Sequence, residues 1–197
     1  MDLKEKFAEV IESNSAGFVA QCYKLEQSPP LGALVKYHDG EKEIYGIVYS
    51  IETHSMEQGR RVAVRGEGVD TRNDIYKDNP QLMKLLATDF RVIVIGYKDS
   101  TGVHYYLPQD PVPIHGFIYY CQSEEYTQFT GSFHFLGLLV DSRLPVSIDE
   151  VIAAFLRHAS HYQTDSTAFL ICAGKELAWF LSGDTKRLTS ILRKLQS

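Results

Sequence analysis

The sequence predicts an α+β protein built on a small antiparallel β-barrel, with a short N-terminal helix and a C-terminal helical segment. Between residues 17 and 121, short runs rich in Val, Ile and Tyr alternate with Gly, Pro and Asp. Short strands separated by such turn formers are typical of barrels and sandwiches. Beyond residue 140, the apolar residues follow the spacing of amphipathic helices instead.

These changes of pattern divide the chain into an N-terminal helix at residues 1–15, a barrel at 16–130 and a mostly helical region at 131–197. The first helix is predicted because its apolar residues recur on one helical face, at Leu3, Phe7, Val10 and Ile11.

The barrel strands are predicted from β-branched and aromatic runs. The run at 91–97 is almost entirely β-branched, which is typical of a strand buried on both faces. The other predicted strands lie at 17–25, 31–38, 43–52, 60–67, 104–108, 114–121 and 133–140. A two-turn helix is predicted at 81–87. The barrel core is expected to include Val35, Ile47, Val92, Val94 and Ile118.

Two helix starts are marked in the C-terminal region. Ser147 is followed by Glu150 three residues later, which is the pattern of a capping box. Asp184 precedes a last helix, in which Leu188, Ile191, Leu192 and Leu195 form one apolar stripe. Each of these helices has an apolar face to bury, so we expect them to cover part of the barrel.

The composition of the chain argues against several classes of function. The chain has 20 basic and 25 acidic residues, and a net charge of −5 does not favour nucleic-acid binding through general phosphate attraction. Cys22, Cys121 and Cys172 are widely spaced, which argues against a zinc ribbon or a disulfide framework. The N-terminus does not resemble a signal peptide, and no apolar run is long enough to span a bilayer. The sequence therefore predicts a cytoplasmic protein without a cofactor.

The middle of the chain resembles the HAS-barrel domain, across about residues 16–125. One part of the resemblance is a succession of glycine-marked strands, at Gly17-Phe18-Val19, Leu31-Gly32-Ala33-Leu34-Val35 and Tyr45-Gly46-Ile47-Val48. A second part is Asn79-Pro80-Gln81-Leu82 leading into the run at 90–97. The third is the proline-rich segment at 107–115, which is similar to the segment that ends the family's barrel.

In that family the barrel precedes the motor of HerA-type ATPases and opens the ATP synthase subunits. The present sequence contains no Gly-x-x-x-x-Gly-Lys-Ser/Thr motif, so ATP hydrolysis is not implied. The resemblance instead implies a non-catalytic interaction or assembly module. Its expected partner is a protein, either an ATPase or a second copy of the chain.

The polar stretch at 66–80 is the candidate contact surface. A segment of this length in a compact domain is often functional, because packing alone does not require it. The candidate interaction residues are Arg65, Gly66, Gly68, Asp70, Arg72 and Asp74.

Other functions remain open at this level. Tyr97, Tyr105 and Tyr119 lie on predicted strands and are candidates for stacking with the bases of single-stranded nucleic acid. An accessory subunit with a small-molecule pocket is a third reading. His158 and His161 are a weak metal-ligand pair, since no third ligand is evident. No nucleophile elbow is present, so an enzyme is not predicted.

Overall fold

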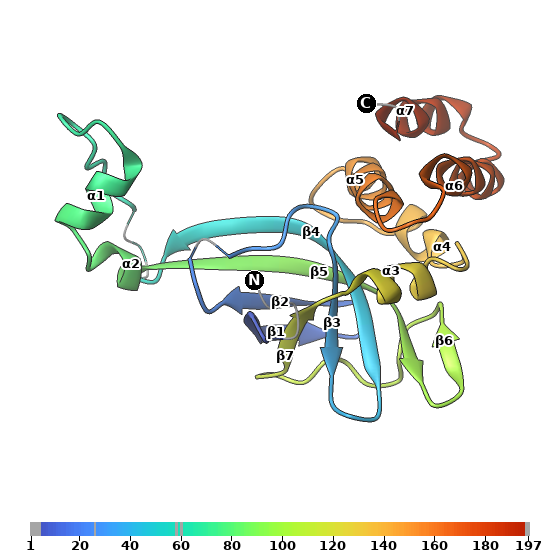
Figure 1. Cartoon of the computed structure of the whole chain (residues 1–197), viewed down its shortest axis with the longest axis horizontal. Coiled ribbons are helices and arrows are strands. Elements are labelled where there is room, and N and C mark those ends of the chain that lie inside the picture. The colour runs from blue at the N-terminus through green and yellow to red at the C-terminus, as the bar shows by residue number, and fades with distance from the viewer. Residues whose placement is uncertain (1–4, 26, 58, 60, 196–197) are drawn as a thin grey trace.

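Six antiparallel strands close into a barrel in the order β1-β2-β5-β4-β3-β7, as the sequence predicts (Figure 1). The computed structural model describes residues 5–25, 27–57, 59 and 61–195. The barrel strands are β1 (Ala8–Asn14), β2 (Gly17–Cys22), β3 (Leu34–His38), β4 (Glu43–Ser55), β5 (Leu86–Asp99) and β7 (Phe117–Tyr120). A short strand, β6 (Gly102–His104), extends the sheet beyond β5.

The predicted N-terminal helix is wrong, because residues 8–14 form β1 and pair with β2 and β7. Leu3 lies outside the described residues. Between Val10 and Glu12 the register shifts by one residue, which is a β-bulge at Ile11. The bulge breaks the strict alternation of the strand, so the apolar spacing resembles that of a helix.

β4 and β5 are much longer than the other strands, and they continue beyond the barrel as a two-stranded ribbon (Figure 1). β2 pairs with β5 only as far as Asp89, whereas β4 and β5 pair on to Ser55 and Leu86. The predicted strand at 60–67 is wrong, since no strand runs through residues 61–67. The helix predicted at 81–87 is shorter in the structure, where it is the single turn α2 (Leu82–Leu85).

Two hydrophobic clusters lie on opposite faces of the barrel wall. The inner cluster fills the barrel and contains Val35, Val92, Val94 and Ile118, as predicted. Ile47, which the sequence also predicts for the barrel core, belongs instead to the outer cluster. Adjacent residues of a strand face opposite sides, so Val48 points into the barrel and Ile47 points toward the helices.

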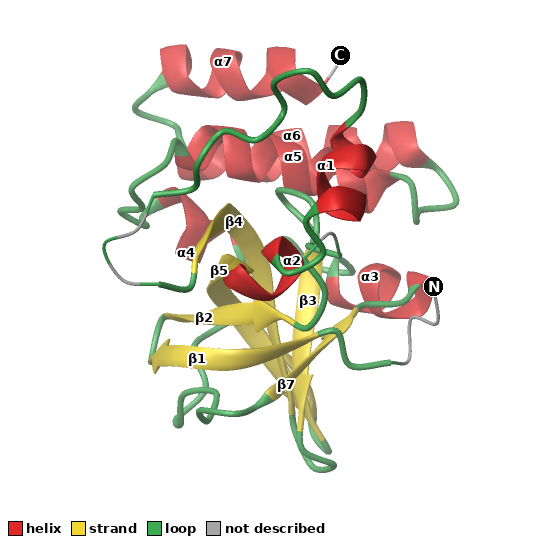
Figure 2. Cartoon of the chain, turned by 90° about the vertical axis from the view of Figure 1, so that its left-hand side faces the viewer, coloured by secondary structure: helices red, strands yellow, loops and turns green. Residues whose placement is uncertain are grey.

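The C-terminal helices form a helical layer beside the outer face of the barrel (Figure 2). They are α3 (Ser123–Phe129), α4 (Leu136–Val140), α5 (Ile148–Ser160), α6 (Ser166–Phe180) and α7 (Thr185–Leu195). Within this layer α5 packs on β4, and α4, α6 and α7 pack on α5.

α5 and α7 begin after Ser147 and Asp184, as predicted, and the Asp184 carboxylate accepts a capping hydrogen bond from the Arg187 backbone. The predicted capping box of Ser147 and Glu150 is wrong, because the Ser147 side chain makes no capping hydrogen bond. The predicted strand at 133–140 is wrong, because it contains α4. Among the described residues, no helix has the length and apolarity to cross a membrane.

A half-buried charge cluster joins the barrel to α3. The Lys36 ammonium of β3 lies between the carboxylates of Glu43, at 2.5 Å, and Glu125. Burial raises the pKa of Glu43, but hydrogen bonds from Lys36 and Tyr45 outweigh it and hold that pKa below its usual value. Glu125 also accepts a hydrogen bond from the Gln122 backbone at the start of α3.

We expect Lys36→Met to lower the free energy of unfolding at pH 7 by about 2 kcal/mol, because two carboxylates lose their shared cation. Glu43, with a lowered folded pKa, contributes stability above its ordinary pKa of 4.5, and this stability is lost as the pH falls. The difference in the free energy of unfolding between the variant and the wild type should therefore become smaller as the pH falls to about 4. Urea denaturation at both pH values measures it, with the exposed Lys24→Met as control. A difference that is the same at both pH values would contradict this role.

Candidate interaction site

Beyond the barrel, the ribbon of β4 and β5 forms the root of an arm. Hydrogen bonds hold this root in place. The Thr53 and Thr88 hydroxyls meet across the two strands at 2.9 Å, and Thr88 also donates to the Leu25 carbonyl. His54 Nε2 lies 2.8 Å from Asp89 Oδ2, and this hydrogen bond raises the pKa of His54. The other oxygen of Asp89 accepts from Gln21 of β2. The direction of the arm is therefore set by the barrel.

The tip of the arm, residues 56–85, is built differently. It contains α1 (Arg72–Asp78) and α2, and neither helix has a buried residue. α1 begins at a capped N-terminus, where the Thr71 hydroxyl accepts a hydrogen bond from the Asp74 backbone. Large apolar side chains are nevertheless exposed at the tip, at Met56, Val62, Val64 and Met83. None of the residues that the structure describes in the tip is buried, so this part of the arm has local structure but no core.

A groove of about 280 Å³ runs between the two sides of the tip. Its apolar wall comes from the two helices and the start of β5, at Ile75, Tyr76, Leu82, Leu85 and Leu86. Three basic residues, Arg61, Arg65 and Arg72, and one acidic residue, Glu57, also line it. The Arg72 guanidinium also lies over the Tyr76 ring, 5.2 Å from its centroid. The groove combines apolar area with positive charge, which suits an acidic segment with an apolar anchor.

Three of the six predicted interaction residues come together at this groove. Arg65 and Arg72 line it, and Gly66 lies against Ile75 on its wall. Gly68 is in a turn with open space around it, and Asp70 is exposed beside α1. Asp74 is engaged in capping α1 and pairs with Lys77. The predicted loop at 66–80 is thus partly helical, since α1 lies within it.

Most residues of the groove wall were not predicted. Val62 was assigned to a strand, and Leu82 and Leu85 to a helix with no stated partner. Ile75, Leu82 and Leu85 recur at i, i+7 and i+10, which is the spacing of one helical face. From this spacing, the three residues could have been predicted to share one apolar surface on both sides of Pro80.

The three candidate stacking tyrosines do not form one surface. Tyr97 packs against His104 and Tyr106 and borders the inner cluster. Tyr105 packs on Phe129 in the outer cluster, between barrel and helices. Tyr119 lies on β7, next to Lys36 of β3 in the sheet. A strand of nucleic acid cannot stack on all three at once.

His158 and His161 lie near each other at the end of α5, in different environments. His158 is half-buried against the rings of Tyr126 and Tyr162, and burial lowers its pKa. His161 is exposed. In the part of the chain that the structure describes, no group of three or more His, Cys, Asp or Glu residues is arranged to hold a metal ion.

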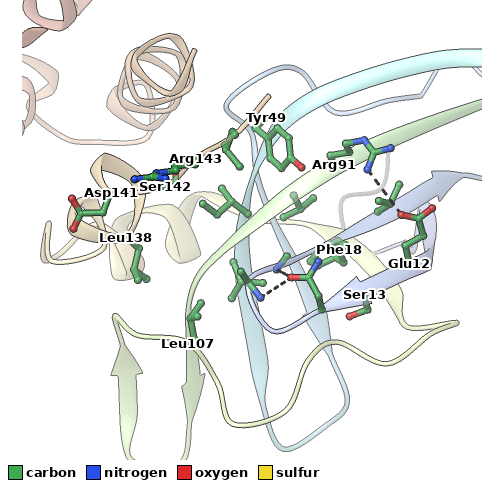
Figure 3. Close-up of a pocket in the computed structure, with 18 of the residues that line it drawn as sticks. Glu12, Ser13, Phe18, Tyr49, Arg91, Leu107, Leu138, Asp141, Ser142 and Arg143 are labelled. Atoms are coloured by element: carbon green, nitrogen blue, oxygen red, sulfur yellow. Dashed lines mark hydrogen bonds and ion pairs between the residues drawn. The ribbon is translucent and has the colours of Figure 1, made fainter. Parts of the chain in front are cut away.

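A second cleft, of about 580 Å³, lies between the β1–β2 hairpin, β5 and the segment after α4 (Figure 3). Arg91 and Glu12 are on one side, 4.0 Å apart, and Asp141 and Arg143 are on the other. The buried Ser13 Oγ has no hydrogen-bond partner among the described residues. Both sides carry both signs of charge, so the cleft does not select one class of small molecule.

Comparison with models of protein families and with curated proteins gave no match for this chain.

Proposed function

We propose that this chain is a non-catalytic interaction or assembly module, in which the arm that extends from the barrel binds a protein partner. The observation that carries the proposal is the contrast between root and tip of the arm. The root is fixed to the barrel by the hydrogen bonds of Asp89 with Gln21 and of Thr88 with the Leu25 carbonyl, whereas the tip exposes Val62, which lines the groove, and also Val64 and Met83. Exposed apolar area of this kind marks contact surfaces.

The groove also indicates the chemistry of the partner. Burial of an apolar side chain against Leu82 and Leu85 would supply hydrophobic free energy, and carboxylates beside it would meet Arg61 and Arg65. The partner segment is therefore expected to be acidic with one or two large apolar residues. The resemblance to the HAS-barrel domain supports an ATPase as the protein that carries this segment, with the present chain as its accessory subunit.

The arm can be removed with little expected effect on the barrel. Ser55 pairs with Leu86, and the Met56 backbone donates to the Leu85 carbonyl, so the ribbon is in hairpin register at this point. We would replace residues 57–84 with Asn-Gly, which closes two-residue hairpins well. The melting temperature should stay within a few degrees of the wild type, since neither tip helix has a buried residue.

Affinity capture from the native cells, quantified by mass spectrometry, then tests the function. The proteins enriched by the wild type should fall at least tenfold with the arm-deleted variant and with Val62→Glu/Met83→Glu. The matched control is Ile114→Glu, an exposed apolar residue on the barrel. Unchanged capture by a stable arm-deleted protein would refute the proposal. Binding of labelled oligo-dT that weakens steeply with salt would favour the nucleic-acid alternative instead.

A further inference from the structure

One edge of the ribbon in the arm has no neighbouring strand. β4 pairs with β5 along its whole length, but on its other edge it meets the β3 side only as far as Val48, which bonds to Gly32 and Ala33. From Ser50 to Ser55 no strand among the described residues pairs with this second edge. In Figure 1, β4 forms the upper side of the ribbon, and no other element lies directly above its outer half. The edge is therefore open to another chain.

The register shows which backbone groups point away from β5. The Met56 N–H donates to the Leu85 carbonyl, and hydrogen-bonded residue pairs alternate with non-hydrogen-bonded ones in an antiparallel ladder. Counting back from this pair, the even positions of β4 as far as 50 exchange hydrogen bonds with β5. The N–H and C=O groups of Ile51 and Thr53 therefore point outward, and they have no hydrogen-bond partner in the part of the chain that the structure describes.

This edge also lacks the usual protection against strand pairing. Edge strands are normally protected by proline, lysine, a bulge or a covering segment. Between Ser50 and Ser55 the strand contains neither proline nor lysine, and its register shift lies before Ser50. Ile51 and Thr53 are exposed on it. An uncovered edge without these features can accept an added strand from a partner.

The same edge leads into the groove of the arm tip. Side chains at alternate positions of a strand share a face, so Ile51 and Thr53 lie on the same face as Ser55. Ser55 lines the groove together with Leu86, the residue opposite it on β5. An extended segment on the edge of β4 can thus continue into the groove and place an apolar side chain against Leu82.

The other face of the ribbon adds a charge preference. Glu52 is exposed there, and the neighbouring His54 is hydrogen-bonded to Asp89. Side chains directly opposite each other on paired strands interact, so a basic side chain opposite Glu52 is favoured and an acidic one is not. The bound segment should therefore be acidic and apolar where it enters the groove, and carry Lys or Arg opposite Glu52.

We propose that the partner binds as an additional β-strand on β4, held by the backbone of Ile51 and Thr53. This inference rests on the proposed function, because it describes how the same arm binds its partner. A helix satisfies its own backbone hydrogen bonds and would leave these outward groups unused. The partner contributes an extended segment of another protein.

Hydrogen exchange of the free whole chain, resolved by NMR, tests the register first. The amides of Ile51 and Thr53 should exchange at least about tenfold faster than those of Glu52 and His54, which are bonded to β5. Equal rates would overturn the assignment of the edge. If the exchange of Ile51 and Thr53 becomes slow at high protein concentration, a second copy covers the edge, and this would overturn the proposal of a separate partner.

The binding mode is tested with peptides selected on the immobilised whole chain from a displayed library of random sequences of about twelve residues. Thr53→Pro removes the outward N–H and spares the ladder with β5, so it should weaken these peptides at least about tenfold. Thr53→Ala is the matched control, because it also loses the hydroxyl bond to Thr88 but keeps the N–H. It should bind within about twofold of the wild type. In the wild-type complex the amides of Ile51 and Thr53 should become slow to exchange.

The outcomes separate this inference from the proposed function. Peptides that lose affinity with Val62→Glu/Met83→Glu but keep it with Thr53→Pro would overturn strand addition and leave the arm tip as the contact surface. Peptides that keep their affinity with both variants would count against the proposed function as well. If Thr53→Pro does not fold, exchange of the Ile51 and Thr53 amides that stays fast in the wild-type complex would overturn the inference instead.

Discussion

Replacing Val94 with Asp is expected to lower the free energy of unfolding by about 4 kcal/mol, enough to unfold much of a marginally stable domain. Val94 is 3% exposed and lies in the inner cluster. It pairs with Gly46 of β4, and its backbone N–H donates to the Ala16 carbonyl at the β1–β2 turn. A carboxylate at this position would be enclosed by apolar side chains without a partner.

Urea denaturation followed by circular dichroism measures this loss. The control is Val64→Asp, because Val64 is 96% exposed at the arm tip, and its replacement should change stability by less than about 0.5 kcal/mol. If Val94→Asp unfolds at the same urea concentration as the wild type, the inner face of the barrel is wrongly assigned.

Gly32→Val is expected to be almost as damaging, with a loss of about 3 kcal/mol, because Gly32 is where the barrel meets α5. A Cβ at Gly32 would lie 2.5 Å from the Phe155 amide nitrogen and 2.6 Å from the Ala154 carbonyl carbon. These are backbone atoms of α5, so the helix would have to move away. The φ angle of +79° at Gly32 is a further source of strain for any side chain.

Gly40→Val separates the cost of backbone strain from the cost of the clash with α5. Gly40 also has a positive φ, of 100°, but nothing lies within 4 Å of its Cβ position. We expect this control to cost only about 1–2 kcal/mol of backbone strain. Limited proteolysis should in addition cut near α5 in Gly32→Val alone. Equal losses for the two variants would show that the contact of α5 with Gly32 does not hold the helical layer.

The fold class could be predicted because most barrel strands keep a local signature. The β-branched run at 91–97 and the glycine-marked strands after Gly17 form β2, β3, β4 and β5 as expected. The errors have physical causes. A bulge at Ile11 imitates helical spacing, and a short apolar run such as 133–140 does not distinguish a strand from a buried helix.

The candidate site was predicted in part. The segment around Arg65 and Arg72 was identified because its polar length has no packing reason. The groove could not be predicted, because its lining residues lie between Ser55 and Leu86 and come together only when β4 pairs with β5. The short apolar run at 168–174 lies within α6, and the sequence alone does not assign it to a helix or a strand. α6 is apolar on two faces, so its periodicity is too weak to mark it as an amphipathic helix.

We propose the arm tip as the surface that meets the partner. The most direct test is photo-crosslinking in the native cells, with a photoreactive phenylalanine analogue placed at Val64 or, as control, at Ile114 on the barrel. Both side chains are exposed, so neither substitution should affect folding. We expect a discrete crosslinked partner from position 64 that is absent from position 114. Crosslinks from position 114 alone, or none from position 64, would contradict it.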